Sequence, residues 1–213
     1  MEVEVWSDVA CPWCYVGKRH LEEALTGFEG ADDVQVTWRS FELDPTAPRV
    51  RDQDAVTLLA AKYGRSHEEA EAMVQSMRET GAKDGLDLRF DIARSGNTFD
   101  AHRLLHLAAA HGIQDAVKER FMRAYQTEGE AIGEPDVLQR LAVDAGLPAD
   151  EVREVLATER FAEEVRADEA QAVEFGIRGV PFFVVDRRVA VSGAQPPEVL
   201  LQLLKQGAEA EAA

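Results

Sequence analysis

The chain carries only two cysteines, Cys11 and Cys14, and they form a Cys-Pro-Trp-Cys segment between a strand-like run and a helix-like one. Unpaired backbone N–H groups and the positive end of the helix dipole favour an anion at a helix start. A thiolate is such an anion, and thiols of Cys-X-X-Cys motifs in this position can have pKa values of about 3.5 to 7.5 instead of about 8.5. The segment therefore predicts a reactive thiol at Cys11.

The chemistry that this spacing favours is thiol–disulfide exchange. Cys11 would form a mixed disulfide with a partner sulfur, and Cys14, one helical turn further on, would resolve it by closing the internal disulfide bond. Pro12 suits the first helical turn, where its missing N–H costs little, and Trp13 is the other residue between the sulfurs that can tune the thiolate. The spacing leaves the direction of exchange open.

The cysteine pair could instead belong to a metal site or to an inert, buried part of the core. A zinc site needs about four ligands, whereas the chain has two cysteines, and His20, six residues after Cys14, has no second histidine beside it. We therefore expect no metal. The placement of Pro12 at a helix start argues against a pair of inert, buried thiols.

The elements around this segment suggest a strand, helix, strand unit. At the start of the chain Val3 and Val5 alternate with Glu2 and Glu4, which is typical of a strand. Residues 34–41 are rich in β-branched and aromatic residues, which favours a second strand. Between them the apolar stripe Leu21, Ala24, Leu25 and Phe28 has helical spacing. Such a crossover normally brings the second strand back parallel to the first.

The middle of the chain has the pattern of a block of helices, and strand texture returns only near the C-terminal end. Helical stripes recur over about residues 50–175, one of them after a capping box formed by Ser66 and Glu69. Strands are expected at 182–185 and 189–191, followed by a helix that begins near Pro197. The predicted fold is α/β, with residues 1–48 and 177–213 forming one layered domain and residues 49–176 an all-helical insertion after the second strand.

Composition narrows the partners and the location. The formal net charge of -17 repels nucleic acid phosphates and anionic lipid surfaces, so we expect no nucleic acid and no membrane partner. No apolar run approaches the ~20 residues that span a bilayer, and the first residues lack a signal-peptide pattern. Two cysteines do not form a disulfide-rich secreted scaffold. A cytoplasmic location is the expectation.

The motif CPWC after a strand, together with GVPFFVV at residues 179–185, resembles the thioredoxin-fold disulfide oxidoreductases of the DsbA type. In that fold a helical domain interrupts the α/β layer after the second strand. The segments SGNTFDAHRLLH and SGAQPPEVL make the chain similar to the FrnE-like branch, which is allied to 2-hydroxychromene-2-carboxylate isomerases and kappa-class glutathione transferases. The resemblance covers nearly the whole chain.

The resemblance implies roles for single residues. Cys11 would be the exposed nucleophile, Cys14 its buried resolving partner, and Pro181 a cis-proline that faces the pair. Val180, just before it, would offer main-chain groups to an extended substrate segment, in the manner of strand addition. Without CPWC, the Val-Pro pair would indicate an ordinary turn or edge proline.

Two residues of the NTFDAHR segment are further candidates for substrate contact. Asn97 precedes a helix, so it could cap that helix, whereas the resemblance implies that its segment faces the thiols. His102 lies off the apolar stripe of the same helix, so it is either a surface or boundary residue or a proton carrier. Asp8 is expected to cap the turn before Cys11, with proton transfer from Cys14 as the alternative.

We expect a thiol–disulfide oxidoreductase or disulfide isomerase that acts on protein or small-molecule thiols. No tightly bound cofactor is expected, and glutathione is the candidate redox partner. A glutathione-dependent transferase or isomerase is the alternative, but those relatives carry serine where Cys11 stands. A non-enzymatic binding module, with its site between the α/β layer and the helical block, is the third hypothesis. In a reducing compartment the exchange would favour a reductase or isomerase role.

Overall fold

The computed structural model describes residues 1–212, with side chains through Ala210. The chain divides into two compact units. We call the first, Met1–Leu43 with the segment from Val165 onward, the α/β unit, and the second, Asp44–Glu164, the helical unit.

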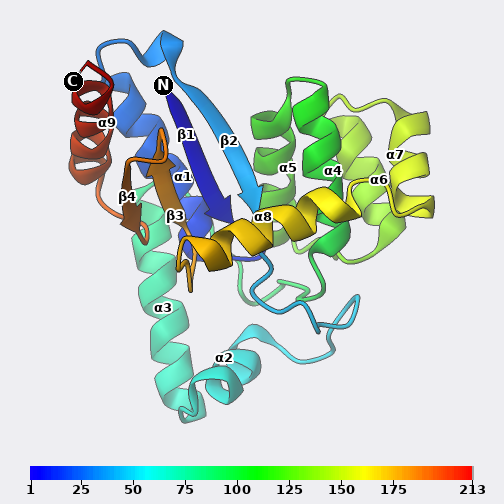
Figure 1. Ribbon diagram of the computed structural model, residues 1–213. Coiled ribbons are helices and arrows are strands. Elements are labelled where there is room, and N and C mark those ends of the chain that lie inside the picture. Colours follow the sequence, from blue (N-terminus) through cyan, green and yellow to red (C-terminus); the bar gives the residue numbers. More distant parts are fainter. Residues whose placement is uncertain (213) are drawn as a thin grey trace. The chain divides into compact units, whose positions relative to one another are not determined.

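A mixed sheet forms the centre of the α/β unit (Figure 1). Its strands are β1 (Glu2–Ser7), β2 (Gln35–Ser40), β3 (Phe182–Val185) and β4 (Val189–Ser192), in the spatial order β2-β1-β3-β4. Strand β2 is parallel to β1, whereas β3 is antiparallel to both β1 and β4. The predicted crossover is confirmed: helix α1 (Pro12–Thr26) and the short 3-10 turn η1 (Ala31–Asp33) connect the two parallel strands.

Strand alternation gives the sheet two buried faces. Helices α1 and α9 (Pro197–Ala212) cover one face, where Val3, Val5, Trp38, Phe183 and Val185 pack against Leu21, Ala24, Leu200, Leu203 and Leu204. Helix α8 (Ala162–Glu174) supplies Ala172 to the other face, where the cluster also holds Trp6, Ile177 and Val184. The alternating pattern of β1 is thus consistent with a strand that is buried on both sides.

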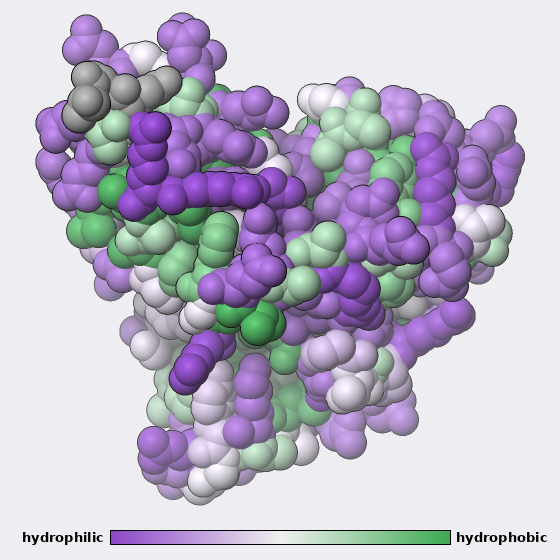
Figure 2. All heavy atoms as spheres, viewed as in Figure 1, coloured by the Kyte–Doolittle hydropathy of each residue, from purple (hydrophilic) through white to green (hydrophobic). Residues whose placement is uncertain are grey.

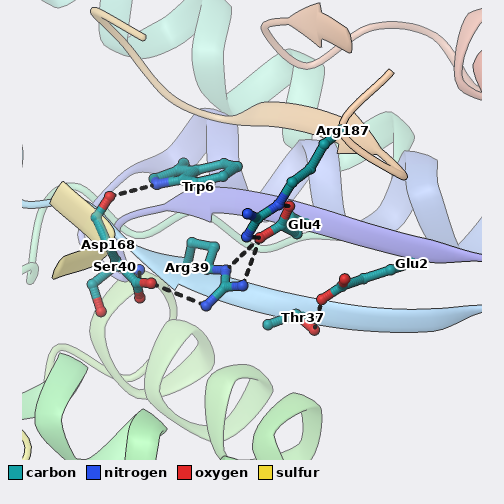
Figure 3. Close-up of polar contacts among 8 residues, drawn as sticks. All are labelled: Glu2, Glu4, Trp6, Thr37, Arg39, Ser40, Asp168 and Arg187. Carbon is teal, nitrogen blue, oxygen red and sulfur yellow. Dashed lines mark hydrogen bonds and ion pairs between the residues drawn. The ribbon is translucent and has the colours of Figure 1, made fainter. Parts of the chain in front are cut away.

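The second face also buries charge, as Figure 3 shows. The Glu4 carboxylate accepts from Arg39 on β2, with Nη2–Oε1 at 2.5 Å, and from Arg187 in the β3–β4 turn, with Nε–Oε2 at 2.9 Å. Burial acts to raise the pKa of Glu4, but hydrogen bonds and charge from Arg187 and Arg39 outweigh it and hold the pKa below its ordinary value. This pairing lets a glutamate occupy an interior strand position.

The same network fixes helix α8 to the sheet. The Asp168 carboxylate accepts from the Ser40 N–H at 2.9 Å and from Arg39 Nη1 at 3.2 Å. The Trp6 indole N–H donates to the Asp168 carbonyl at 2.9 Å, and the Trp6 ring meets Phe175 edge-on. Helix α8 is therefore held by directed polar contacts as well as by apolar packing.

The helical unit contains α2 (Ala55–Tyr63), α3 (His67–Lys83), α4 (Phe99–Ala110), α5 (Gln114–Gln126), α6 (Pro135–Asp144) and α7 (Ala149–Ala157). The Ser66–Glu69 capping box is confirmed at the start of α3. Arg103 on α4 is buried and donates to the carbonyls of Val155, Thr158 and Arg160 at the end of α7. Since carbonyls at a helix end lack partners within the helix, Arg103 joins α7 to α4.

The compact units differ from the predicted domain division mainly at the second boundary, which falls at residue 164 instead of 176. The reason is that α8, from Val165 on, packs on the sheet.

The points where the chain leaves and re-enters the α/β unit also touch. Arg166 pairs with the Glu42 carboxylate at 3.2 Å, and the Glu42 N–H donates to Glu169 at 3.3 Å.

The face of the molecule drawn in Figure 2 is strongly polar. Hydrophilic residues predominate on the face drawn in Figure 2, in agreement with the net charge of -17. Among the residues that the structure describes, no helix combines the length and the apolar character needed to cross a bilayer.

Candidate active site

The two cysteines lie at the start of α1, as the sequence predicts. Cys11 is the N-cap residue, with φ -86° and ψ 114°, and Pro12 is the first helical residue. The Cys11 carbonyl accepts from the N–H groups of Cys14 at 3.1 Å and Tyr15 at 3.3 Å. Proline fits here because the N–H that it lacks would have no partner within the helix. The Cys11 sulfur consequently lies at the positive end of the helix.

Asp8 braces the loop between β1 and α1. Its buried carboxylate accepts from the Ala10 N–H at 3.2 Å and from the Leu43 N–H at 2.8 Å, and its carbonyl accepts from the Cys11 N–H at 3.2 Å. The expectation that Asp8 caps the turn is confirmed. No sequence pattern indicates the contact with Leu43, which ties the cysteine loop to the chain that follows β2.

Several groups act on the Cys11 thiol. The hydrogen bond from the Cys14 thiol has the largest effect and lowers the Cys11 pKa, while burial raises it. The N–H groups of Cys14 and Trp13 lower the pKa further, and the Asp8 carboxylate raises it. The balance holds the pKa of Cys11 below its ordinary value, in the direction expected for a thiol at a helix N-terminus.

The Val180 carbonyl lies against the Cys11 thiol, and Pro181 follows it directly in the chain. The peptide bond between these residues is cis, as predicted, and the Cys11 thiol donates to the Val180 carbonyl with sulfur and oxygen 3.7 Å apart. The prediction of an exposed Cys11 is wrong, because only 4% of this residue is accessible, and the Val180 carbonyl lies directly against its sulfur. Cys14 is fully buried, as expected.

The residues between the sulfurs differ in accessibility. Trp13 is 46% exposed and Pro12 is half-buried, so the indole is the larger surface that this turn offers to solvent. Within the described part of the chain, no group of three or more His, Cys, Asp or Glu side chains is arranged to hold a metal ion.

Asn97 and His102 belong to the helical unit. Thr98 is the N-cap residue of α4, and the Asn97 side-chain oxygen, one position earlier, accepts from the first helical N–H, that of Phe99, at 2.9 Å. His102 is completely buried, which corrects the expectation of a surface or boundary residue. It is buried because α4 packs against α5, α6 and α7 in the middle of this unit. The role of Asn97 and His102 in substrate contact stays a prediction.

Gly17 is a further residue of the site that the predictions did not include. A β-carbon built at this position would lie 2.9 Å from Pro181 Cγ and 3.3 Å from Phe183 Cζ. An isolated glycine inside a helical pattern usually has a packing reason. The isolated glycine inside a helical pattern, six residues after Cys11, could therefore have identified Gly17 from the sequence.

Comparison with known proteins places this geometry in a family. A family model described as the DSBA-like thioredoxin domain matches residues 2–205. The chain belongs to this family. The predicted membership of the DsbA-type family and the predicted fold class are thereby confirmed, including the thioredoxin-like fold with its helical insertion.

Solved structures of DSBA-like proteins agree. A probable DsbA oxidoreductase from Streptomyces coelicolor is 48% identical, with a TM-score of 0.92 over 97% of this chain and 89% of that chain. The cytosolic disulfide reductase DsbM from Pseudomonas aeruginosa, solved with GSH, is 18% identical, with a TM-score of 0.67 over 98% of this chain and 100% of its own. A 2-hydroxychromene-2-carboxylate isomerase is 13% identical, with a TM-score of 0.72 over 100% and 98% of the two chains. The last two share the fold.

Proposed function

We propose that this DSBA-like protein is a thiol–disulfide oxidoreductase or disulfide isomerase that works through Cys11 and Cys14. The observation that carries the proposal is the Cys11 sulfur at the N-terminus of α1, with the Cys14 thiol donating to it and a lowered pKa. The lowered pKa increases the share of thiolate at Cys11, and the thiolate is the form that attacks a disulfide sulfur.

The exchange has two steps in the reducing direction. The Cys11 thiolate attacks one sulfur of the substrate disulfide, the substrate S–S bond breaks, and the second substrate sulfur leaves as a thiolate. Cys14 gives its proton to the leaving thiolate and attacks the Cys11 sulfur, which releases the first substrate sulfur as a thiolate that takes a proton from water. One substrate disulfide becomes two thiols, and Cys11 and Cys14 become a disulfide; the oxidising direction is the reverse.

Main-chain and aromatic groups beside the sulfurs would hold the substrate. The main chain of Val180 borders Cys11 and leads directly into Pro181, and Trp13 offers an exposed ring in the first turn of α1. We propose that Pro12, Trp13 and Val180 contact a protein or small-molecule thiol substrate. Asn97 and His102 are proposed as substrate contacts from the helical unit on the family resemblance alone.

We further propose that glutathione is the redox partner, with no tightly bound cofactor, and that the protein works in the cytoplasm. DsbM, which shares the fold, is a cytosolic disulfide reductase and was solved with GSH, which supports this choice. In a reducing compartment the expected direction is reduction or isomerisation.

The test is equilibration of the purified protein with graded glutathione buffers, followed by acid trapping and intact mass measurement. We expect an internal Cys11–Cys14 disulfide with a measurable midpoint, and a glutathione adduct that accumulates on Cys11 in Cys14→Ser. A persistent Cys11 adduct in the unmodified protein, without an internal bond, would contradict the proposal. Retained turnover with glutathione in Cys11→Ser would instead favour a transferase or isomerase of the 2-hydroxychromene-2-carboxylate type.

A further inference from the structure

Helix α1 and the segment before β3 approach one another at Gly17. The distance of 2.9 Å between a built β-carbon and Pro181 Cγ is shorter than real β-carbons show, and Phe183 Cζ would lie only 3.3 Å away. Glycine in a helix interior is destabilising by roughly 0.5–1 kcal/mol relative to alanine. The close approach supplies a reason to keep glycine here.

This contact lies next to the nucleophile. Pro181 packs on Gly17, and Val180, the residue before it, is the one whose carbonyl oxygen lies 3.7 Å from the Cys11 sulfur. A protonated thiol can donate to this oxygen, whereas a thiolate has no proton to donate and would face the negative end of the carbonyl dipole. Hydrogen bonding of the neutral form disfavours ionisation.

We propose that Gly17 is a positioning residue for thiol exchange: its missing side chain lets the Val180–Pro181 segment lie against α1, which holds the Val180 carbonyl on the Cys11 thiol and restrains ionisation of that thiol. The inference rests on the proposed function and adds a control on its nucleophile. It concerns the α/β unit alone, since all four residues belong to that unit.

The other groups that act on Cys11 come from different segments. Within the α/β unit, the charged or titratable groups that act most on it include the Asp8 carboxylate and the Cys14 thiol, and the N–H groups of Trp13 and Cys14 also donate toward it. These belong to the β1–α1 loop and the first turn of α1. A small displacement of Pro181 would therefore move the Val180 carbonyl while leaving them in place.

The experiment titrates the ultraviolet absorbance of the thiolate in Cys14→Ser protein, where Cys11 is the single thiol and serine can still donate to it. Adding Gly17→Ala should lower the Cys11 pKa, so that the ratio of thiolate to thiol below the pKa rises about threefold, the effect of one weak hydrogen bond. Gly27→Ala at the end of α1 is the control, because its β-carbon would meet Leu201 at an ordinary 3.6 Å. A Cys11 pKa that is unchanged or raised in Gly17→Ala overturns the inference.

A second measurement covers the case in which Gly17→Ala does not fold. In Cys14→Ser protein the chemical shift of the Val180 carbonyl carbon should follow the titration of Cys11. The reason is that the Cys11 thiol can no longer donate a hydrogen bond to this carbonyl once it has lost its proton. A Val180 shift that stays flat through this titration overturns the inference. The proposed function is tested separately, by whether the unmodified protein forms an internal Cys11–Cys14 disulfide in glutathione buffer.

Discussion

Arg39 offers a sharp test of how the α/β unit is held together, because it serves two buried carboxylates. It contacts Glu4 at 2.5 Å and Asp168 at 3.2 Å, and its side chain is only 23% exposed. Breaking a buried ion pair by removing one partner costs about 3–5 kcal/mol. Since Glu4 keeps Arg187 and Asp168 keeps the Ser40 N–H, we expect Arg39→Met to lose about 3 kcal/mol, the lower end of that range.

Arg187→Met is the matched control. Arg187 contacts the same Glu4 carboxylate at 2.9 Å, but its side chain is 51% exposed. Exposed pairs contribute about 0–1 kcal/mol, so this variant should lose about 1 kcal/mol or less. The assay is urea unfolding of the reduced proteins at neutral pH, with the slope m compared to confirm that only stability has changed.

The pH dependence supplies a second criterion. The folded-state pKa of Glu4 is lowered, so its stabilisation is present above the unfolded value, near 4.5, and is lost as pH falls through the folded pKa. In Arg39→Met the Glu4 pKa should rise, because one of the groups that lower it is gone. The variant therefore has less of this stabilisation to lose as the pH falls. The difference in the free energy of unfolding between wild type and Arg39→Met should therefore narrow below about pH 4.5. Two results would refute the role given to Arg39 in the network. One is an equal loss of stability in Arg39→Met and Arg187→Met, and the other is a stability difference between wild type and Arg39→Met that does not narrow at low pH.

The contacts of single side chains support three more predictions. In the reduced, folded protein at neutral pH, iodoacetamide should modify Cys11 faster than Cys14, because the Cys11 pKa is lowered and 4% of this residue is accessible, whereas Cys14 is fully buried; peptide mass mapping over a time course checks this. Asp8→Asn removes a carboxylate that raises the Cys11 pKa, so the thiolate fraction below that pKa should rise about threefold in an absorbance titration; a fall would contradict the assignment. Arg103→Met leaves carbonyls at the end of α7 without their donor and should cost about 2–4 kcal/mol in urea unfolding, whereas Arg153→Met, 57% exposed, should cost less than about 0.5 kcal/mol.

Local patterns predicted much of this molecule. The Cys-Pro-Trp-Cys turn, the strand–helix–strand crossover and the Ser66–Glu69 box each depend on residues close together in sequence, and all are present. The cis bond before Pro181 came from the family resemblance and is also present.

The features that sequence reasoning missed depend on distant partners. Glu4 is buried because Arg39 and Arg187 reach it from other strands and turns, and a glutamate in an alternating run gives no sign of such partners. The burial of Cys11 likewise depends on Val180, which is 169 positions away. Helix α8 joins the sheet through Asp168, which resembles any other acidic residue of an acidic chain.

The contact between Glu42 and Arg166, where the chain leaves and re-enters the α/β unit, has an evolutionary consequence. Because these two points touch, everything between them acts on the α/β unit as one closed loop, and the entropy of closing a loop grows only slowly with its length. Insertions and deletions between residues 44 and 164 can therefore accumulate without shifting the register of β1, β2 or β3. The length of the helical unit can therefore change while the α/β unit that carries Cys11 keeps its fold.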